Sequence, residues 1–254
     1  MSVNPMSLSG RRVLVTGASS GIGRDVSILL SELGASVVLV ARRVDKLEET
    51  RARMTGNGHH VEPFDLSSPE VIPEWIKHVA DQSGPLHGLV HSAGIQVTQP
   101  LRNLSYEQLQ LVMRINFESA ALLVKGFRQK GVCDPGGASV VLLASIMALV
   151  GQPGIAVYAA SKGALVALAK SLALELARDR IRINCVAPGH VRTEMADKLH
   201  EKLTPDQVSA IEKMHPLGFG QPRDVSHAVA FLLAETGRWI TGTVLVVDGG
   251  YTTH

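Results

Sequence analysis

The chain has few cysteines, few aromatic residues and almost no net charge. Only Cys133 and Cys185 occur among 254 residues, without the spacing of metal ligands, so we expect free thiols in a reducing compartment and no metal site. The 25 basic residues nearly balance the 23 acidic ones, leaving a net charge of +2. This balance gives no reason to expect binding to nucleic acid or to an anionic membrane.

Long hydrophobic runs are also missing. No uninterrupted stretch of about 18 apolar residues occurs, so the sequence indicates no bilayer span. Residues 1–9 lack the basic and then apolar pattern of a secretion signal. We therefore expect a cytoplasmic protein.

What the chain does contain is short hydrophobic segments that alternate with longer amphipathic ones. The short segments are nearly continuous in Val, Leu and Ile, which is typical of strands buried on both faces of a parallel sheet. The alternation predicts an α/β fold with a doubly wound parallel sheet of Rossmann type and helices on both faces, forming one domain over residues 1–254. We expect strands at 13–16, 36–41, 61–64, 88–91, 139–144, 181–186 and 243–247, and helices at 23–33, 44–53, 70–83, 106–130, 158–178 and 223–234.

Residues 190–220 interrupt this alternation between the sixth strand and the last long helix. They predict irregular chain or short helices. Loops beyond the carboxyl ends of the strands carry ligands in this architecture, so we predict that the insertion is a substrate lid.

A glycine-rich segment follows the first predicted strand and leads into a helix. Its spacing is G-x-x-x-G-x-G over residues 17–23, and glycines let the backbone approach a phosphate closely while the helix start offers unpaired N–H groups. A plain turn is the alternative, but the flanking strand and helix favour a phosphate-binding loop. The residues expected at a dinucleotide are Gly17, Ser19, Ser20, Gly21, Ile22 and Gly23.

Arg42 and Arg43 follow the second predicted strand, where an NAD site would carry Asp or Glu. A guanidinium group binds a 2′-phosphate through charge-assisted hydrogen bonds, whereas a carboxylate repels it. The alternative is that both arginines are solvated charges at a strand exit. We predict NADPH rather than NADH as the cofactor.

Tyr158 and Lys162 are four residues apart on a predicted helix, so their side chains share one face. Ser145 precedes Tyr158 by thirteen residues. A free tyrosine titrates near pH ~10, and a neighbouring cation lowers that pKa. The Y-x-x-x-K spacing is common by chance, so its meaning depends on the other motifs.

Together these motifs resemble the short-chain dehydrogenase/reductase family over residues 8–251. The resemblance implies the sheet order 3-2-1-4-5-6-7 and a catalytic tetrad of Asn116, Ser145, Tyr158 and Lys162. It also implies contacts to the cofactor from Tyr158, Lys162, Asp65, Leu66, Ala93, Gly94, Pro188, Gly189, Val191 and Thr193.

The same resemblance implies a role for each member of the tetrad. NADPH would deliver hydride to a carbonyl carbon while Tyr158 protonates the oxygen, or the reverse. Ser145 would hydrogen-bond that oxygen, Lys162 would lower the tyrosine pKa and hold the ribose, and Asn116 would anchor a proton-relaying water. Taken singly, each residue has a structural alternative: a strand-end serine, an asparagine bonded to its own backbone, a solvated lysine.

His91 is a departure from the family pattern. His91, Ser92, Ala93 and Gly94 stand where the family usually has Asn-Asn-Ala-Gly or Asn-Ala-Ala-Gly. The usual asparagine ties neighbouring strands together. We predict that His91 does the same with its ring nitrogens and is not catalytic.

The pattern is most similar to that of NADPH-dependent 3-oxoacyl reductases, which act on thioesters of acyl carrier protein or coenzyme A. Some carrier-protein reductases have an arginine where this chain has Leu174, which weakens the carrier-protein alternative. Reduction of another secondary alcohol or polyketide-like ketone, and a non-catalytic NADPH-binding role, are the other hypotheses. The resemblance further implies a homotetramer, and the expected substrate pocket includes Gln96, Met147, Gln152, His190 and Met195.

Overall fold

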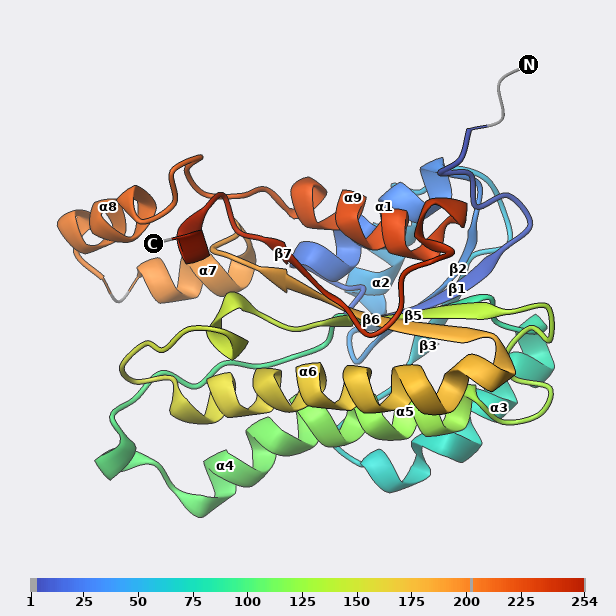
Figure 1. The fold of residues 1–254 in the computed structure, drawn as a ribbon, viewed down its shortest axis with the longest axis horizontal. Helices are drawn as coiled ribbons and strands as arrows, with labels where there is room; N and C mark the ends of the chain where they lie inside the picture. Colours follow the sequence, from blue (N-terminus) through green and yellow to red (C-terminus); the bar gives the residue numbers. More distant parts are fainter. Residues whose placement is uncertain (1–3, 202, 254) are drawn as a thin grey trace.

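The computed structural model describes residues 4–201 and 203–253. Seven parallel strands form one sheet in the order β3-β2-β1-β4-β5-β6-β7, which confirms the predicted fold class and strand order (Figure 1). The strands are β1 (Arg12–Thr16), β2 (Ser36–Ala41), β3 (His60–Pro63), β4 (Gly88–His91), β5 (Ala138–Leu143), β6 (Ile181–Pro188) and β7 (Val244–Val247).

Helices cover both faces of the sheet (Figure 1). One face carries α1 (Gly21–Glu32), α2 (Val44–Arg51) and α9 (Pro222–Leu233). The other carries α3 (Ile72–Ser83), α4 (Tyr106–Met113), α5 (Ser119–Phe127) and α6 (Ala156–Leu176).

The strands are hydrophobic throughout because both of their faces are buried. In β1, Leu14 belongs to the apolar core beneath α3, α5 and α6, while Val13 and Val15 belong to the core beneath α1 and α9. Alternate side chains of a strand point to opposite faces, so each strand supplies both cores. This explains why the sequence shows continuous apolar runs rather than polar alternation.

The predicted helix 106–130 is one long helix interrupted by a π turn. Arg114–Glu118 form that turn between α4 and α5, and Asn116 within it is fully buried. A π turn inserts an extra residue into the helix and often marks a functional site, but it leaves the apolar periodicity almost unchanged. The sequence pattern therefore did not reveal it.

Strand β6 continues two residues further than predicted. Ala187 and Pro188 pair with Val246 and Val247 of β7, which carries the sheet to the point where the insertion at 190–220 begins. Pro188 is tolerated because it is the last residue of the strand.

The insertion at 190–220 contains two short helices, α7 (Glu194–His200) and α8 (Pro205–Lys213). Thr193 caps α7, and a capping box of Thr204 and Gln207 starts α8. An isolated bridge between Val191 and Gly220 joins the two ends of the insertion, so its base is attached to the rest of the fold.

The segment Ala156–Asp179, which includes α6, is long and apolar enough to cross a membrane by length and composition alone, with a mean hydropathy of 1.3. The expectation that nothing resembles a span was therefore incomplete, because it considered only uninterrupted apolar runs. A core helix passes the same test, and here Leu165, Ala169 and Ala173 pack in the apolar core against the sheet.

Candidate active site

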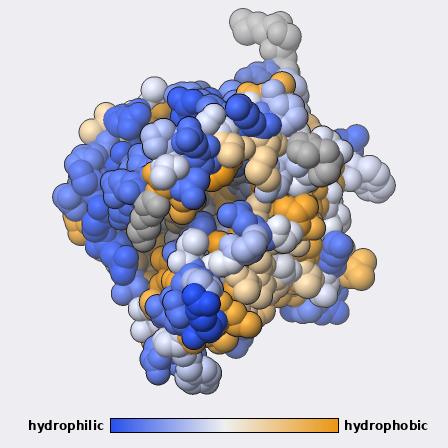
Figure 2. All heavy atoms as spheres, turned by 90° about the vertical axis from the view of Figure 1, so that its left-hand side faces the viewer, coloured by the Kyte–Doolittle hydropathy of each residue, from blue (hydrophilic) through white to orange (hydrophobic). Residues whose placement is uncertain are grey.

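The loops that follow β1, β4, β5 and β6 meet at the carboxyl edge of the sheet. Parallel strands bring these loops together whatever their separation in sequence. Figure 2 looks onto this edge, where the surface is hollowed between hydrophilic and hydrophobic side chains. All of the residues predicted to be catalytic lie on these loops or on the helices that follow them.

Ser145 follows β5 and Tyr158 lies in the first turn of α6, so the loop between β5 and α6 separates them in sequence. Ser145 is the extended residue that follows the strand, and its Oγ accepts a hydrogen bond of 3.2 Å from the Met147 N–H. Burial raises the pKa of Tyr158, and a hydrogen bond with the Ser145 side chain opposes this only in part. Tyr158 is therefore a neutral phenol at neutral pH, which suits a proton donor.

Lys162 lies one turn after Tyr158 and is almost fully buried. Its Nζ donates a hydrogen bond of 2.7 Å to the Leu143 carbonyl and is 5.8 Å from the centroid of the Tyr158 ring. Burial lowers the pKa of Lys162 to about 8, with a small opposing effect of Cys185. The pKa of Tyr158 is raised by burial, and Lys162 is not among the groups that lower it, so the expected lowering of the tyrosine pKa by Lys162 is not found.

Asn116 uses its whole side-chain amide to join two parts of the site. Its Oδ1 accepts from the Ile95 N–H at 2.8 Å, while Nδ2 donates to the Ile95 carbonyl and to Ser161 Oγ, both at 2.9 Å. The π turn thus attaches the loop after β4 to helix α6, one residue before Lys162. The structural alternative, an asparagine bonded to its own backbone, is wrong.

His91 makes the kind of contact that the sequence predicted for it. Its Nδ1 is 3.1 Å from Thr16 Oγ1 on β1, and the same hydroxyl accepts from the Ala93 N–H at 3.2 Å. Burial and the charge of Lys162 lower the pKa of His91 to about 3, so the ring is neutral. His91 Nε2 has no hydrogen-bond partner among residues 4–201 and 203–253.

The phosphate loop requires glycine at two of its positions. Gly17 has a φ of 70°, and a Cβ there would lie 2.9 Å from the Ala93 nitrogen. A Cβ at Gly23 would lie 2.3 Å from the Gly17 carbonyl oxygen. The loop is thus pressed against the segment after β4, and Ser20 ends it as the N-cap residue of α1. Of the remaining predicted residues, Ser19 lies in the turn before Ser20, and Gly21 and Ile22 are the first two residues of α1.

A carboxylate from the insertion at 190–220 already lies at the N-terminus of α1. Glu194 Oε2 accepts a hydrogen bond of 2.9 Å from the Gly21 N–H, and Glu194 Oε1 is 3.7 Å from Arg24. The partial positive charge of a helix N-terminus favours anions of this kind. The loop therefore fits a phosphate-bearing cofactor. The Gly21 N–H, which here donates to Glu194, is the donor that a phosphate oxygen would use.

Arg42 and Arg43 lie at the carboxyl end of β2, both exposed to solvent. Neither forms an ion pair with the part of the chain that the structure describes. Two guanidinium groups beside the phosphate loop fit a 2′-phosphate. Asp65 and Leu66 follow β3 on the neighbouring strand, the first exposed and the second buried.

The other predicted cofactor residues lie along the same edge. Ala93 and Gly94 follow β4, and a Cβ at Gly94 would lie 3.3 Å from both Asn116 Oδ1 and Lys162 Nζ. Pro188 at the end of β6 and Val191 beyond it are buried, and Gly189 between them is packed on Asp248. Thr193 Oγ1 accepts from the Ala196 N–H as the cap of α7.

The predicted substrate residues come from three loops. Gln96 follows β4, Met147 and Gln152 follow β5, and His190 and Met195 follow β6. Gln152 and Met195 are exposed, whereas the other three are partly buried. The structure places all five at the carboxyl edge, and whether they line one pocket stays a prediction.

Sequence reasoning missed the partners of His190. His200 and His215 lie beside it, and Phe219 packs over its ring with centroids 4.3 Å apart. These residues share no periodicity, and the only available signal was three histidines within one insertion. Among the described residues no group of three or more His, Cys, Asp or Glu side chains could hold a metal ion.

The family model described as enoyl-(acyl carrier protein) reductase matches residues 17–252. The chain belongs to the short-chain dehydrogenase/reductase family. It is 34% identical over 244 residues to a 3-oxoacyl-[acyl-carrier-protein] reductase of Rickettsia conorii, covering 96% of this chain and 97% of that protein.

Two solved structures extend the comparison. A provisionally named short-chain alcohol dehydrogenase of Sinorhizobium meliloti superposes with a TM-score of 0.92 and 32% identity over 98% of this chain and 99% of that one. A provisionally named 2-deoxy-D-gluconate 3-dehydrogenase of Agrobacterium tumefaciens, solved with bound NADP, has a TM-score of 0.88 and 29% identity over 99% and 100%. This family member is an NADP-dependent oxidoreductase that acts on a small molecule bearing an alcohol or carbonyl group.

Proposed function

We propose that the protein is an NADPH-dependent carbonyl reductase that converts a 3-oxoacyl thioester to the 3-hydroxy product. The observation that carries the proposal is the meeting of four side chains from three elements: Ser145 after β5, Tyr158 and Lys162 on α6, and Asn116 in the π turn. In a non-catalytic NADPH-binding protein there is no chemical reason to keep all four.

When bound by these residues, NADPH would supply the hydride that adds to the carbonyl carbon. The residues of the chain handle the charge that then develops on the carbonyl oxygen. Ser145 Oγ donates a hydrogen bond to that oxygen, and the neutral phenol of Tyr158 transfers its proton to it. The negative charge left on Tyr158 is stabilised by Lys162, which is still largely protonated at pH 7 because its pKa is about 8.

Asn116 and the phosphate loop position these groups. The amide of Asn116 fixes the Ile95 loop against Ser161, and thereby the turn of α6 that carries Lys162. The N–H groups at the start of α1 hold the pyrophosphate, while Arg42 and Arg43 hold the 2′-phosphate. We propose that the lid, residues 190–220, then covers the substrate.

The choice of substrate rests on the resemblance to the Rickettsia conorii protein and on the exposed surface of the last turn of α6. Leu174 is 85% exposed where an arginine could meet an acidic carrier protein. Arg128, a cation at the end of α5, is already paired with Glu175 at 3.0 Å and with Asp179 at 2.7 Å. We therefore favour a coenzyme A thioester or another small thioester over one bound to a carrier protein.

We propose a homotetramer in the cytoplasm as the working form. Helix α6 is apolar almost all round, but only 28% of its most hydrophobic window is buried in the monomer. A second copy packed against α4 and α6 would cover the exposed remainder. Sedimentation analysis tests this, because a monomer would contradict the proposal.

The assay that tests the reaction measures NADPH oxidation with acetoacetyl coenzyme A and with a panel of cyclic ketones. Higher kcat/KM for the thioester supports the proposal, and preference for a cyclic ketone favours the alternative of another secondary alcohol or polyketide-like ring. NADPH binding without turnover of any carbonyl would favour a regulatory protein.

Tyr158→Phe links this activity to the site. The variant keeps the ring and loses the proton donor, so we expect kcat to fall by about 10²- to 10⁴-fold with NADPH affinity unchanged. Tyr106→Phe, at a residue that is 68% exposed on α4, is the matched control and should keep full activity.

A further inference from the structure

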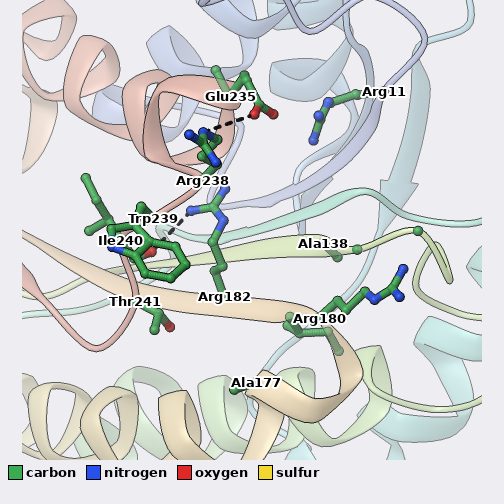
Figure 3. Close-up of a pocket in the computed structure, with 14 residues that line it drawn as sticks. Arg11, Ala138, Ala177, Arg180, Arg182, Glu235, Arg238, Trp239, Ile240 and Thr241 are labelled. Carbon is green, nitrogen blue, oxygen red and sulfur yellow. Dashed lines mark hydrogen bonds and ion pairs between the residues drawn. The ribbon is translucent and has the colours of Figure 1, made fainter.

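A cavity of about 570 Å³ lies at the edge of the sheet opposite to Tyr158 (Figure 3). It is lined by the first residues of β5 and β6, the end of α6 and the connection from α9 to β7. Strand β6 separates this edge from Pro188, and its eight residues span roughly 23 Å. The cavity is therefore separate from the catalytic residues and from the phosphate loop.

Four arginines line this arginine cavity: Arg11, Arg180, Arg182 and Arg238. Glu235 is the single carboxylate among the fourteen lining residues, and it pairs with Arg238 at 3.6 Å. Arg11 and Arg180 form no ion pair with residues 4–201 or 203–253. Figure 3 shows the Arg180 side chain directed away from Arg182 and Glu235, so the three positive charges of Arg11, Arg182 and Arg238 share the cavity with one negative charge.

Arg182 is held rigidly in the middle of this group. Its Nη1 donates to the Leu232 carbonyl at 2.8 Å and to the Ile240 carbonyl at 3.4 Å, so the guanidinium is fixed between the end of α9 and the following loop (Figure 3). The pKa of Arg182 is lowered, first by burial and then by the charge of Arg11. The other guanidinium nitrogens of Arg182 have no partner in the described part of the chain.

Trp239 borders the same cavity with an exposed indole. Its side chain is 92% exposed, although a large aromatic ring is normally covered. The other tryptophan, Trp75, stacks on Phe64 with ring centroids 4.0 Å apart. Trp239 and Arg182 both line the cavity, so a ligand that spans it would meet an exposed indole and a fixed positive charge (Figure 3).

We propose that the arginine cavity binds a phosphate ester that carries a flat aromatic ring, of the size of a nucleotide. The volume falls within the range of small-molecule sites. Guanidinium groups bind phosphate oxygens through paired, charge-assisted hydrogen bonds, and an indole offers a face for stacking. The ligand would neutralise Arg11, Arg182 and Arg238 and cover Trp239.

Calorimetric titration of the protein saturated with NADP⁺ tests the proposal, since saturation removes binding at the phosphate loop. The probes are ADP, inorganic pyrophosphate and adenosine. We expect saturable binding of ADP, weaker binding of pyrophosphate, which lacks the ring, and weakest binding of adenosine, which lacks the phosphates. Tryptophan fluorescence should change with ADP in the wild type and not in Trp239→Leu.

The variants Arg11→Gln and Arg238→Gln should each raise the Kd for ADP about tenfold, the loss expected for one charge-assisted contact. Trp239→Leu should weaken ADP and leave pyrophosphate unchanged. Arg53→Gln, at an exposed arginine after α2, is the matched control and should change neither. Arg182 is not replaced, because its carbonyl contacts support the fold. NADPH oxidation should be the same in every variant.

Absence of ADP binding to the NADP⁺-saturated wild type would overturn the proposal. So would ADP binding that Arg11→Gln and Arg238→Gln leave unchanged. If ADP does not bind and Arg238→Gln has a lower molecular mass in sedimentation, a second copy of the chain fills the cavity instead.

Discussion

His190 Nε2 lies 2.9 Å from His200 Nε2, and the two imidazole rings stack with centroids 4.9 Å apart. One nitrogen of this contact must donate and the other must accept, so at most one ring can carry a proton at this position. His215 completes the group, because its Nε2 accepts from the His190 backbone N–H at 3.1 Å. Its Nδ1 is 2.9 Å from the Ile211 carbonyl, which can only accept, so the proton of His215 is on Nδ1.

This contact makes the stability of the insertion, residues 190–220, depend on pH. Burial, His200 and His215 lower the pKa of His190 from 6.5 to about 4. His190 therefore binds a proton more readily when the insertion is opened than when it is packed in place, and the stabilisation is complete above pH 6.5 and decreases as the pH falls toward 4. Between pH 7.5 and 5.5 the opening equilibrium should rise by up to about tenfold.

Amide hydrogen exchange of residues 190–220 at these two pH values measures the effect. His200→Asn keeps a side chain that can hydrogen-bond and removes one titrating ring, so its pH dependence should be smaller. His227→Asn, at an exposed histidine of α9, is the control. Equal loss of protection in wild type and His200→Asn would contradict the role of the histidine pair.

Lys162 should determine the alkaline limit of carbonyl reduction. Burial lowers its pKa to about 8, so the charge that stabilises the Tyr158 phenolate is present below that pH and lost above it. We expect kcat for reduction to fall as the pH rises through about 8. In Lys162→Arg the charge persists, and the decline should move to higher pH, although kcat itself will be lower. Lys170→Arg, on an exposed turn of the same helix, should keep the wild-type profile, and an unchanged decline in Lys162→Arg would be evidence against this role.

Arg42 should determine the preference for NADPH over NADH. Arg42→Ala removes a charge-assisted contact to the 2′-phosphate, so we expect the Kd of NADPH to rise by about 10- to 100-fold and that of NADH to change little. Arg53→Ala, further along the same strand–helix unit, serves as the control. Equal losses for the two cofactors would show that the 2′-phosphate lies elsewhere.

Glu194 should compete with the cofactor for the Gly21 N–H. Glu194→Gln removes a negative charge from the N-terminus of α1, and we expect NADPH to bind about threefold more tightly at low ionic strength, with the gain shrinking in high salt. Fluorescence titration of NADPH at two salt concentrations measures this, with Glu201→Gln, at another exposed residue of the lid, as the control. Weaker binding to Glu194→Gln would mean that this carboxylate supports the cofactor instead.

The strands were predictable because a strand buried on both faces leaves a direct trace in the sequence. All seven appear within two residues of the predicted bounds, and β2 and β4 match them fully. The insertion at 190–220 was predictable as a short-helix region, since its capping residues and prolines are local signals. The π turn at Asn116 was not, because one extra residue in a helix turn barely disturbs the apolar periodicity.

By itself, the order of residues along the chain determined the alternation of strands and helices, the phosphate loop and the spacing of Tyr158 and Lys162, because each depends on a local pattern. Only the tertiary structure decided which side chains meet. It joined Asn116 to Ser161, Glu194 to Gly21 and His190 to His200, and it placed four arginines around one cavity. Contacts between distant segments arise from packing and burial, which also set the pKa values of the site, and neither leaves a periodic signal in the sequence.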